Sequence, residues 1–145
     1  PTIKSRAQQL ELRSITEKQS EQLLDDLKVT DAKQRSQLLF MASGLPAELS
    51  RLAGNADYFE HRSQIVRDAR TFLQGSEYDR LKIAHIYKDD REKALLLLND
   101  ALKLLQNNIE QGKDQLLPKL EPLLRSYERV AANGNVRLQL AGAMV

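Results

Sequence analysis

Apolar residues recur at helical spacing along most of the chain. One such stripe consists of Phe59, Ile65, Val66, Ala69, Phe72 and Leu73. This spacing places the apolar side chains on one face of an α-helix. The stretch from Ala94 to Ile109 is so rich in leucine and alanine that we expect its helix to contact neighbours on more than one side. Alternation typical of a strand appears only at residues 8–13, so we predict an all-α chain with one short N-terminal strand.

Capping residues, glycines and prolines mark where the helices begin and end. Ser14 or Thr16 is expected to cap the first helix and Asp31 the second, and Pro46 falls near the start of the third. Five longer or later helices are predicted to begin near 57, 76, 89, 118 and 136. The weakest join is Gly54-Asn55, where we place a domain boundary. The predicted organisation is therefore a strand-containing segment at 1–13, three short helices at 14–55 and a helical bundle at 56–145.

Composition fits a helical globular protein and excludes several chemistries. Hydrophobic residues make up 41% of the chain and aromatic residues only 5%, which favours a core of leucine, alanine and isoleucine. The net charge of +2 is too small to indicate nucleic-acid binding. The chain has no cysteine, which excludes disulfides and thiolate catalysis, and no apolar run approaches the ~20 residues of a membrane span. We expect a cytoplasmic protein without membrane contact.

No group of residues in the sequence points to an enzyme. His61 and His85 lie on separate predicted helices, and no Gly-x-x-x-x-Gly-Lys-Ser/Thr motif is present, so we expect no metal and no cofactor. The exception is Ser5-Arg6, directly before the predicted strand. An arginine suits bidentate contact with phosphate oxygens and can stabilise charge on ATP bound by a neighbouring subunit. An ordinary surface position is the commoner explanation of such a pair.

Four segments resemble the clamp-loader subunits of the bacterial DNA polymerase III holoenzyme. Residues 2–8, Thr-Ile-Lys-Ser-Arg-Ala-Gln, resemble the family's Ser-Arg-Cys motif, with Ala7 in place of the cysteine. Residues 43–49, Ser-Gly-Leu-Pro-Ala-Glu-Leu, resemble a segment of the helical lid domain. Residues 88–92 and 132–138 resemble parts of the C-terminal oligomerisation domain. The segments follow the family's order over essentially the whole chain.

The resemblance implies an architecture and a role for each part. It implies that residues 1–13 end an AAA+ ATPase domain, that 14–55 form a three-helix lid and that 56–145 form a helical collar. Arg6, beside Ser5, would be a trans arginine finger on ATP bound by the adjacent subunit. Ala47 stands where the ATP-hydrolysing gamma/tau subunit has a sensor arginine. The resemblance therefore favours the delta-prime subunit, which does not turn over ATP.

The resemblance also implies binding partners, and two alternative identities of the chain remain open. The collar would bind the gamma/tau and delta subunits, DNA would be met only through the whole complex, and the chain would be the C-terminal part of a larger protein with no enzymatic activity of its own. A gamma/tau or archaeal-type small subunit is the nearest alternative. An unrelated helical interaction module is the alternative from another class.

Overall fold

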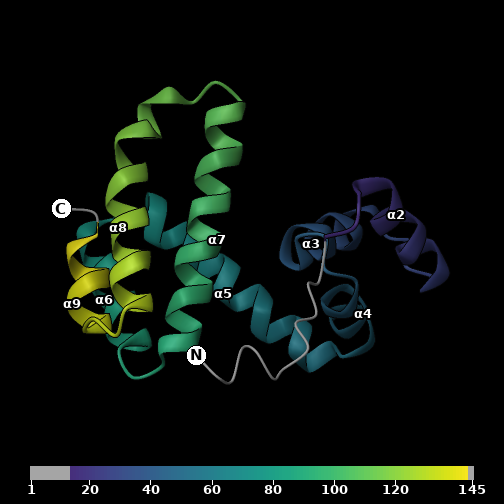
Figure 1. The fold of residues 1–145 in the computed structure, drawn as a ribbon, viewed down its shortest axis with the longest axis horizontal. Helices are drawn as coiled ribbons and strands as arrows, with labels where there is room; N and C mark the ends of the chain where they lie inside the picture. Colours follow the sequence, from purple (N-terminus) through teal and green to yellow (C-terminus); the bar gives the residue numbers. More distant parts are fainter. Residues whose placement is uncertain (1–13, 144–145) are drawn as a thin grey trace, which may run out of the picture. The chain divides into compact units, whose positions relative to one another are not determined.

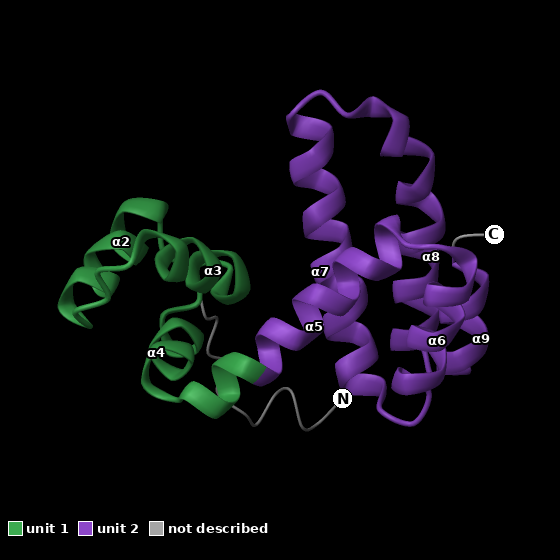
Figure 2. Ribbon diagram, turned by 180° about the vertical axis from the view of Figure 1, so that it is seen from behind, with its two compact units in different colours: residues 1–60 green, residues 61–145 purple. Residues whose placement is uncertain are grey.

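The computed structural model describes residues 14–143, and these residues form helices and turns only (Figure 1). The prediction of an all-α fold is confirmed for this part of the chain. The strand predicted at 8–13 lies outside the described residues. Contacts between residues divide the chain into two units, residues 1–60 and residues 61–145 (Figure 2). The division falls inside a helix, five residues beyond the boundary placed at 55/56, and the lid and collar assignments stay predictions.

The first unit contains three short helices with well-defined ends. They are α2 (Glu17–Asp26), α3 (Ala32–Ala42) and α4 (Pro46–Gly54). Thr16, not Ser14, caps α2, because its hydroxyl accepts from the amide of Gln19 while the Gln19 side chain accepts from the amide of Thr16. Asp31 caps α3. The apolar faces of the three helices meet in a core of Leu24, Val29, Leu38, Met41, Ala42, Leu49 and Leu52.

The turn between α3 and α4 lies against the segment that enters α2. Ser43 and Gly44 both adopt positive φ angles, 51° and 77°. The Ile15 amide donates a hydrogen bond to the Gly44 carbonyl at 2.8 Å. A Cβ atom on Gly44 would lie 3.0 Å from the Ile15 carbonyl oxygen, so the close approach and the left-handed backbone both require glycine here.

The second unit is a bundle around one long helix. Its elements are α5 (Ala56–Gln74) from residue 61 on, α6 (Glu77–Tyr87), α7 (Arg91–Glu110), the 3₁₀ helix η1 (Asp114–Lys119), α8 (Leu120–Ala131) and α9 (Val136–Gly142). Helix α7 pairs with α8 in a hairpin, and α6 packs against α9. The largest fully buried side chains are Phe72, Leu73, Leu97, Leu98, Leu105, Leu123, Val130 and Leu140. Ser76 caps α6 and Asp90 caps α7 through their side chains, as the sequence indicated.

One detail of this unit differs from the sequence prediction. The helix predicted to start at or after Pro118 begins at Leu120, as expected, but the turn before it is the 3₁₀ helix η1, which was not predicted. Pro118 lies inside η1. Proline has no amide hydrogen to donate, and this short 3₁₀ helix accommodates that loss. The last helix begins at Val136, as predicted, and ends at Gly142.

The turn from α8 to α9 is fixed by backbone geometry and by one arginine. Asn133 has a φ of 65°, and the Gly134 amide donates to the Arg129 carbonyl at 2.7 Å. The Asn135 side chain then caps α9 by accepting from Leu138. Arg91, the first residue of α7, donates to the carbonyls of Val130 and Gly134. These bonds give the Val130 carbonyl, which also accepts from the Asn133 amide, a second donor, and they give the Gly134 carbonyl of the turn a partner.

We predict that Gly134→Ala destabilises the chain by about 1–3 kcal/mol, the usual cost of forcing atoms into a closed site. The new Cβ would lie 2.5 Å from the Arg129 carbonyl oxygen, and that oxygen cannot move without opening the end of α8. The measurement is urea unfolding followed by circular dichroism. Gly54→Ala is the matched control, because a Cβ there meets nothing within 4 Å and should be neutral or stabilising. Equal effects of the two substitutions would contradict the account.

Candidate functional site

The residues that the sequence singled out for phosphate chemistry are not placed by the structure. Ser5 and Arg6 lie outside residues 14–143. His61 and His85 are exposed on α5 and α6. Among the described residues, no group of His, Asp and Glu could hold a metal ion. None of the helices between residues 14 and 143 is both long and apolar enough to cross a membrane.

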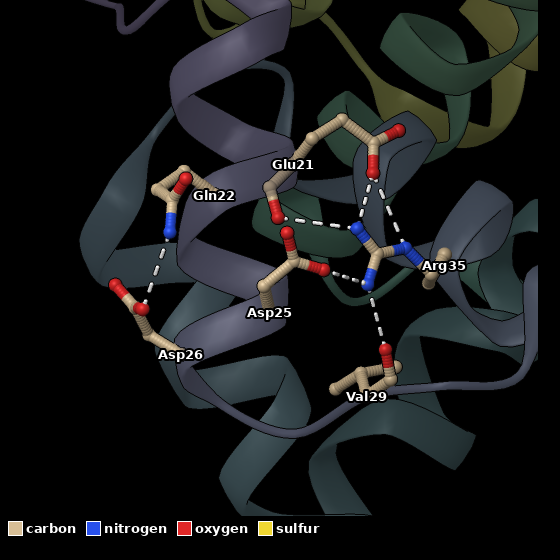
Figure 3. Close-up of polar contacts among 6 residues, drawn as sticks. All are labelled: Glu21, Gln22, Asp25, Asp26, Val29 and Arg35. Carbon is tan, nitrogen blue, oxygen red and sulfur yellow. Dashed lines mark hydrogen bonds and ion pairs between the residues drawn. The ribbon is translucent and has the colours of Figure 1, made fainter.

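The most highly bonded cation of the first unit is Arg35 on α3 (Figure 3). Its Nε and Nη2 atoms donate to the carboxylate of Glu21, and Nη2 also donates to the Glu21 carbonyl at 3.1 Å. Its Nη1 atom donates to Asp25 and to the Val29 carbonyl, both at 2.8 Å. One guanidinium thus ties α3 to α2 and to the loop that follows α2.

This arrangement gives Arg35 a structural role, because it holds α3 against α2 and the loop after α2. A guanidinium has five N–H donors, and the five bonds of Arg35 all go to groups of its own unit. The hydrogen bond to Glu21, and then the one to Asp25, raise the pKa of Arg35, which is charged at every physiological pH in any case. The site therefore offers neither a donor for phosphate nor a pH-dependent switch.

The second unit contains a buried ion pair between α5 and α7. Arg62 donates to both carboxylate oxygens of Asp100, at 2.9 and 3.3 Å. The side chains are 5% and 0% exposed. Lys103 approaches the same carboxylate at 3.7 Å, and burial lowers the pKa of Lys103 although Asp100 opposes that shift. Burial removes the water that would solvate the two charges, and the bidentate hydrogen bonds compensate for this desolvation cost.

A tyrosine extends this buried polar region. The Tyr87 hydroxyl donates to Asp68 at 2.7 Å and joins α6 to α5. Desolvation of the hydroxyl, followed by its bond to Asp68, raises the pKa of Tyr87 well above its usual value. Tyr87 thus stays neutral and serves as a donor. The bonds of this region all join helices of one unit, so we assign the region a structural role.

Open apolar surface is concentrated on the second unit. Seven of the nine exposed large hydrophobic side chains of the described residues belong to it: Tyr78, Leu81, Ile86, Leu96, Leu117, Leu124 and Leu138. The other two, Leu27 and Leu45, belong to the first unit. Scattered exposed leucines are normal, whereas exposed apolar side chains that lie together are typical of surfaces that bind protein.

The hairpin of α7, η1 and α8 carries three of these exposed side chains, as many as α6. Figure 1 shows the far end of α7, η1 and the start of α8 extending beyond α6 and α9. Leu117 is 50% exposed and Leu124 is 44% exposed. Several further hairpin residues are only partly covered: Leu95, Leu102, Leu104, Ile109, Leu116, Leu120 and Tyr127. We call the exposed Leu117 and Leu124, together with these partly covered residues, the hairpin surface.

Comparisons with known proteins add no evidence on function, so the geometry described above is the main evidence. No protein-family model matches the chain, and neither the curated proteins nor the solved structures give a match.

The polar groups described above were missed at the sequence level, although two of them leave a signal. Asp100 follows Leu97 at helical spacing, and Arg62 precedes Ile65 and Ala69 in the same way. A charge on an otherwise apolar stripe indicates a buried partner of opposite charge. Two other acids also have separate structural roles: Asp90 caps α7, whereas Asp25 binds Arg35.

We predict that Asp100→Asn destabilises the second unit by about 3–5 kcal/mol, because it leaves the Arg62 charge buried without its counter-charge. The measurement is the free energy of unfolding in urea. Glu121→Gln is the control: it breaks the exposed pair of Glu121 with Arg125 and should cost no more than about 0.5 kcal/mol. Arg62→Met combined with Asp100→Leu should recover most of the loss. A cost below ~1 kcal/mol for Asp100→Asn would contradict this account of the pair.

We also predict that the chain loses stability above pH ~10, where tyrosine ionises in an unfolded chain. Because the pKa of Tyr87 is raised in the folded state, the folded chain resists ionisation of this hydroxyl. The contribution of neutral Tyr87 to the free energy of unfolding is therefore full below pH ~10 and falls as the pH rises. Unfolding free energies measured from pH 8 to 11 should show a smaller alkaline loss in Tyr87→Phe. The exposed Tyr78→Phe is the control and should retain the loss. Identical pH profiles for Tyr87→Phe and the unsubstituted chain would refute the prediction.

Proposed function

We propose that this chain is the lid and collar part of the delta-prime subunit of a bacterial DNA polymerase III clamp loader. In this role it supplies the contacts that assemble the loader, which places the sliding clamp on primed DNA. The observation that carries the proposal is the hairpin surface, since a helical unit that binds neighbouring subunits needs open apolar area.

A second support comes from the two segments that resemble the collar domain. Residues 88–92 include Asp90, which caps α7, and Arg91. Residues 132–138 form the turn into α9, and Arg91 donates to Gly134 of that turn at 2.9 Å. The resembling segments, some forty residues apart in sequence, therefore meet in one hydrogen-bonded arrangement. This contact gives a physical reason for these residue types to occur together.

In the proposed assembly the chain acts on ATP only through a neighbour. Arg6 reaches the ATP of the adjacent subunit as a trans arginine finger, with Ser5 beside it. The chain itself binds no nucleotide, and it meets DNA only as part of the complex. Ala47, exposed in the first turn of α4, has no guanidinium to offer to a nucleotide, which supports delta-prime over gamma/tau.

We predict that the purified chain is retained by an immobilised gamma/tau collar and that Leu117→Gln with Leu124→Gln abolishes the retention. The two glutamines remove apolar area from the hairpin surface while occupying positions that already face water. Leu27→Gln is the control, a comparably exposed leucine on the first unit, and should leave retention unchanged. Failure of the unsubstituted chain to bind, or measurable ATP binding by the chain alone, would reject delta-prime. An unrelated helical module would give the first result.

A further inference from the structure

We propose that Asn133, in the turn between α8 and α9, is a site of spontaneous deamidation, and that the folded turn suppresses the reaction until it opens. Water is the only co-reactant, and the product at this position is aspartate or isoaspartate. This inference goes beyond the proposed function, because it concerns a covalent modification of the chain itself and needs no partner.

The sequence places the two residue types that this reaction favours side by side. Among the asparagines of the chain, Asn133 alone is followed by glycine. In deamidation the main-chain nitrogen of the following residue attacks the side-chain amide carbon of the asparagine. A side chain on the following residue crowds that attack, whereas glycine leaves it open. Asparagine is one of the thermolabile residues for this reason.

The structure of the turn requires both residues. Asn133 has a φ of 65°, in the left-handed region that asparagine adopts more readily than most other residues. A Cβ atom on Gly134 would lie 2.5 Å from the Arg129 carbonyl oxygen, so only glycine fits there. The geometry that joins α8 to α9 therefore creates a chemically labile pair.

The other asparagines of the chain are in less reactive surroundings. Asn133 is exposed, so water reaches its side-chain amide. The side-chain oxygens of Asn55 and Asn135 instead accept from the amides of Tyr58 and Leu138 at helix starts. The remaining asparagines lie inside α7, where the helical backbone holds the amide nitrogens in hydrogen bonds. We therefore expect deamidation to be confined to Asn133.

The reaction joins two atoms of the turn and releases ammonia. The Gly134 nitrogen loses its proton and attacks Cγ of Asn133. The bond from Cγ to Nδ2 breaks, and Nδ2 leaves as ammonia with a proton from the solvent. One water then opens the resulting five-membered imide at either of its two carbonyls, which gives aspartate or isoaspartate. One water is consumed, one ammonia is released and no redox step is involved.

The closed turn opposes the first step of this reaction. The Gly134 amide donates to the Arg129 carbonyl at 2.7 Å, and the Gly134 carbonyl accepts from Arg91 at 2.9 Å. The first bond retains the proton that must leave, and the two bonds together fix the peptide groups on both sides of Gly134. Attack therefore proceeds from local openings of the turn, and its rate follows the population of the open form.

The modification would loosen α9 permanently. Isoaspartate adds one carbon to the main chain, so the turn cannot regain the bond between the Gly134 amide and the Arg129 carbonyl. Helix α9 begins directly after this turn and places Val136 and Leu140 in the core. It packs against α6 and α8. A covalent change at Asn133 is thus transmitted to the contacts of the last helix.

Peptide mapping by mass spectrometry during incubation of the whole chain at mildly alkaline pH tests the proposal. The product should be confined to Asn133, and it should form at least about tenfold faster in guanidinium chloride than in the folded chain. Asn133→Gly keeps the positive φ without the reactive amide, so it should fold normally and give no product.

Substitution of Arg91 tests the protection by the turn. Arg91→Gln should raise the rate at Asn133 at least about threefold, because the turn loses its side-chain donor. Arg91→Lys, which keeps the charge but not the fork of donors, should give a smaller increase in the same direction. Arg125→Gln is the control, because the Arg125 guanidinium binds Glu121 of its own helix, and should leave the rate unchanged.

Three results would overturn the proposal: equal rates in the folded and unfolded chain, product at another asparagine before Asn133, or unchanged rates in both Arg91 variants. The isoaspartate fraction, separated by ion exchange, should also show faster hydrogen exchange in α9 than the unmodified chain, and unchanged exchange would reject the loosening of α9. None of these readouts involves a partner, so failure of the proposed function leaves them unaffected.

Discussion

The buried pair of Arg62 and Asp100 is the interaction of the second unit in which the loss of one partner is expected to cost the most. Apolar packing can tolerate small shifts, but a desolvated guanidinium must keep its carboxylate within hydrogen-bond distance. That requirement fixes where α5 crosses α7. Tyr87 and Asp68 then fix α6 on α5, so the helices of the core are held at specific positions as well as buried.

Arg35 and Arg91 are also guanidinium groups that must keep their acceptors within hydrogen-bond distance. Each arginine satisfies carbonyl groups that helix ends and loops leave without partners. Arg35 does so after α2, and Arg91 at the turn between α8 and α9, where Gly134 admits no side chain. The polar contacts of both units therefore serve structure, and the open apolar faces of the second unit remain the part of the described chain available to partners.

The sequence predicted the helices well because their ends depend on local chemistry. Thr16, Asp31, Ser76 and Asp90 each cap a helix with their own side chains, and such bonds span only three residues. The 3₁₀ turn before Leu120 was missed although its hydrogen bonds are local, whereas the division inside α5 follows from contacts over the whole fold, which no local pattern indicates. The same holds for Arg62 with Asp100. Arg6, the candidate for phosphate contact, lies outside the described residues and stays a prediction.

The central functional claim is that the hairpin surface binds a neighbouring clamp-loader subunit. Hydrogen exchange, measured by mass spectrometry with and without the gamma/tau collar, tests it most directly because it locates protection along the chain. The account predicts slower amide exchange in the C-terminal half of α7, in η1 and in the first turns of α8. Unchanged exchange throughout the hairpin, or protection confined to residues 14–60, would contradict the claim.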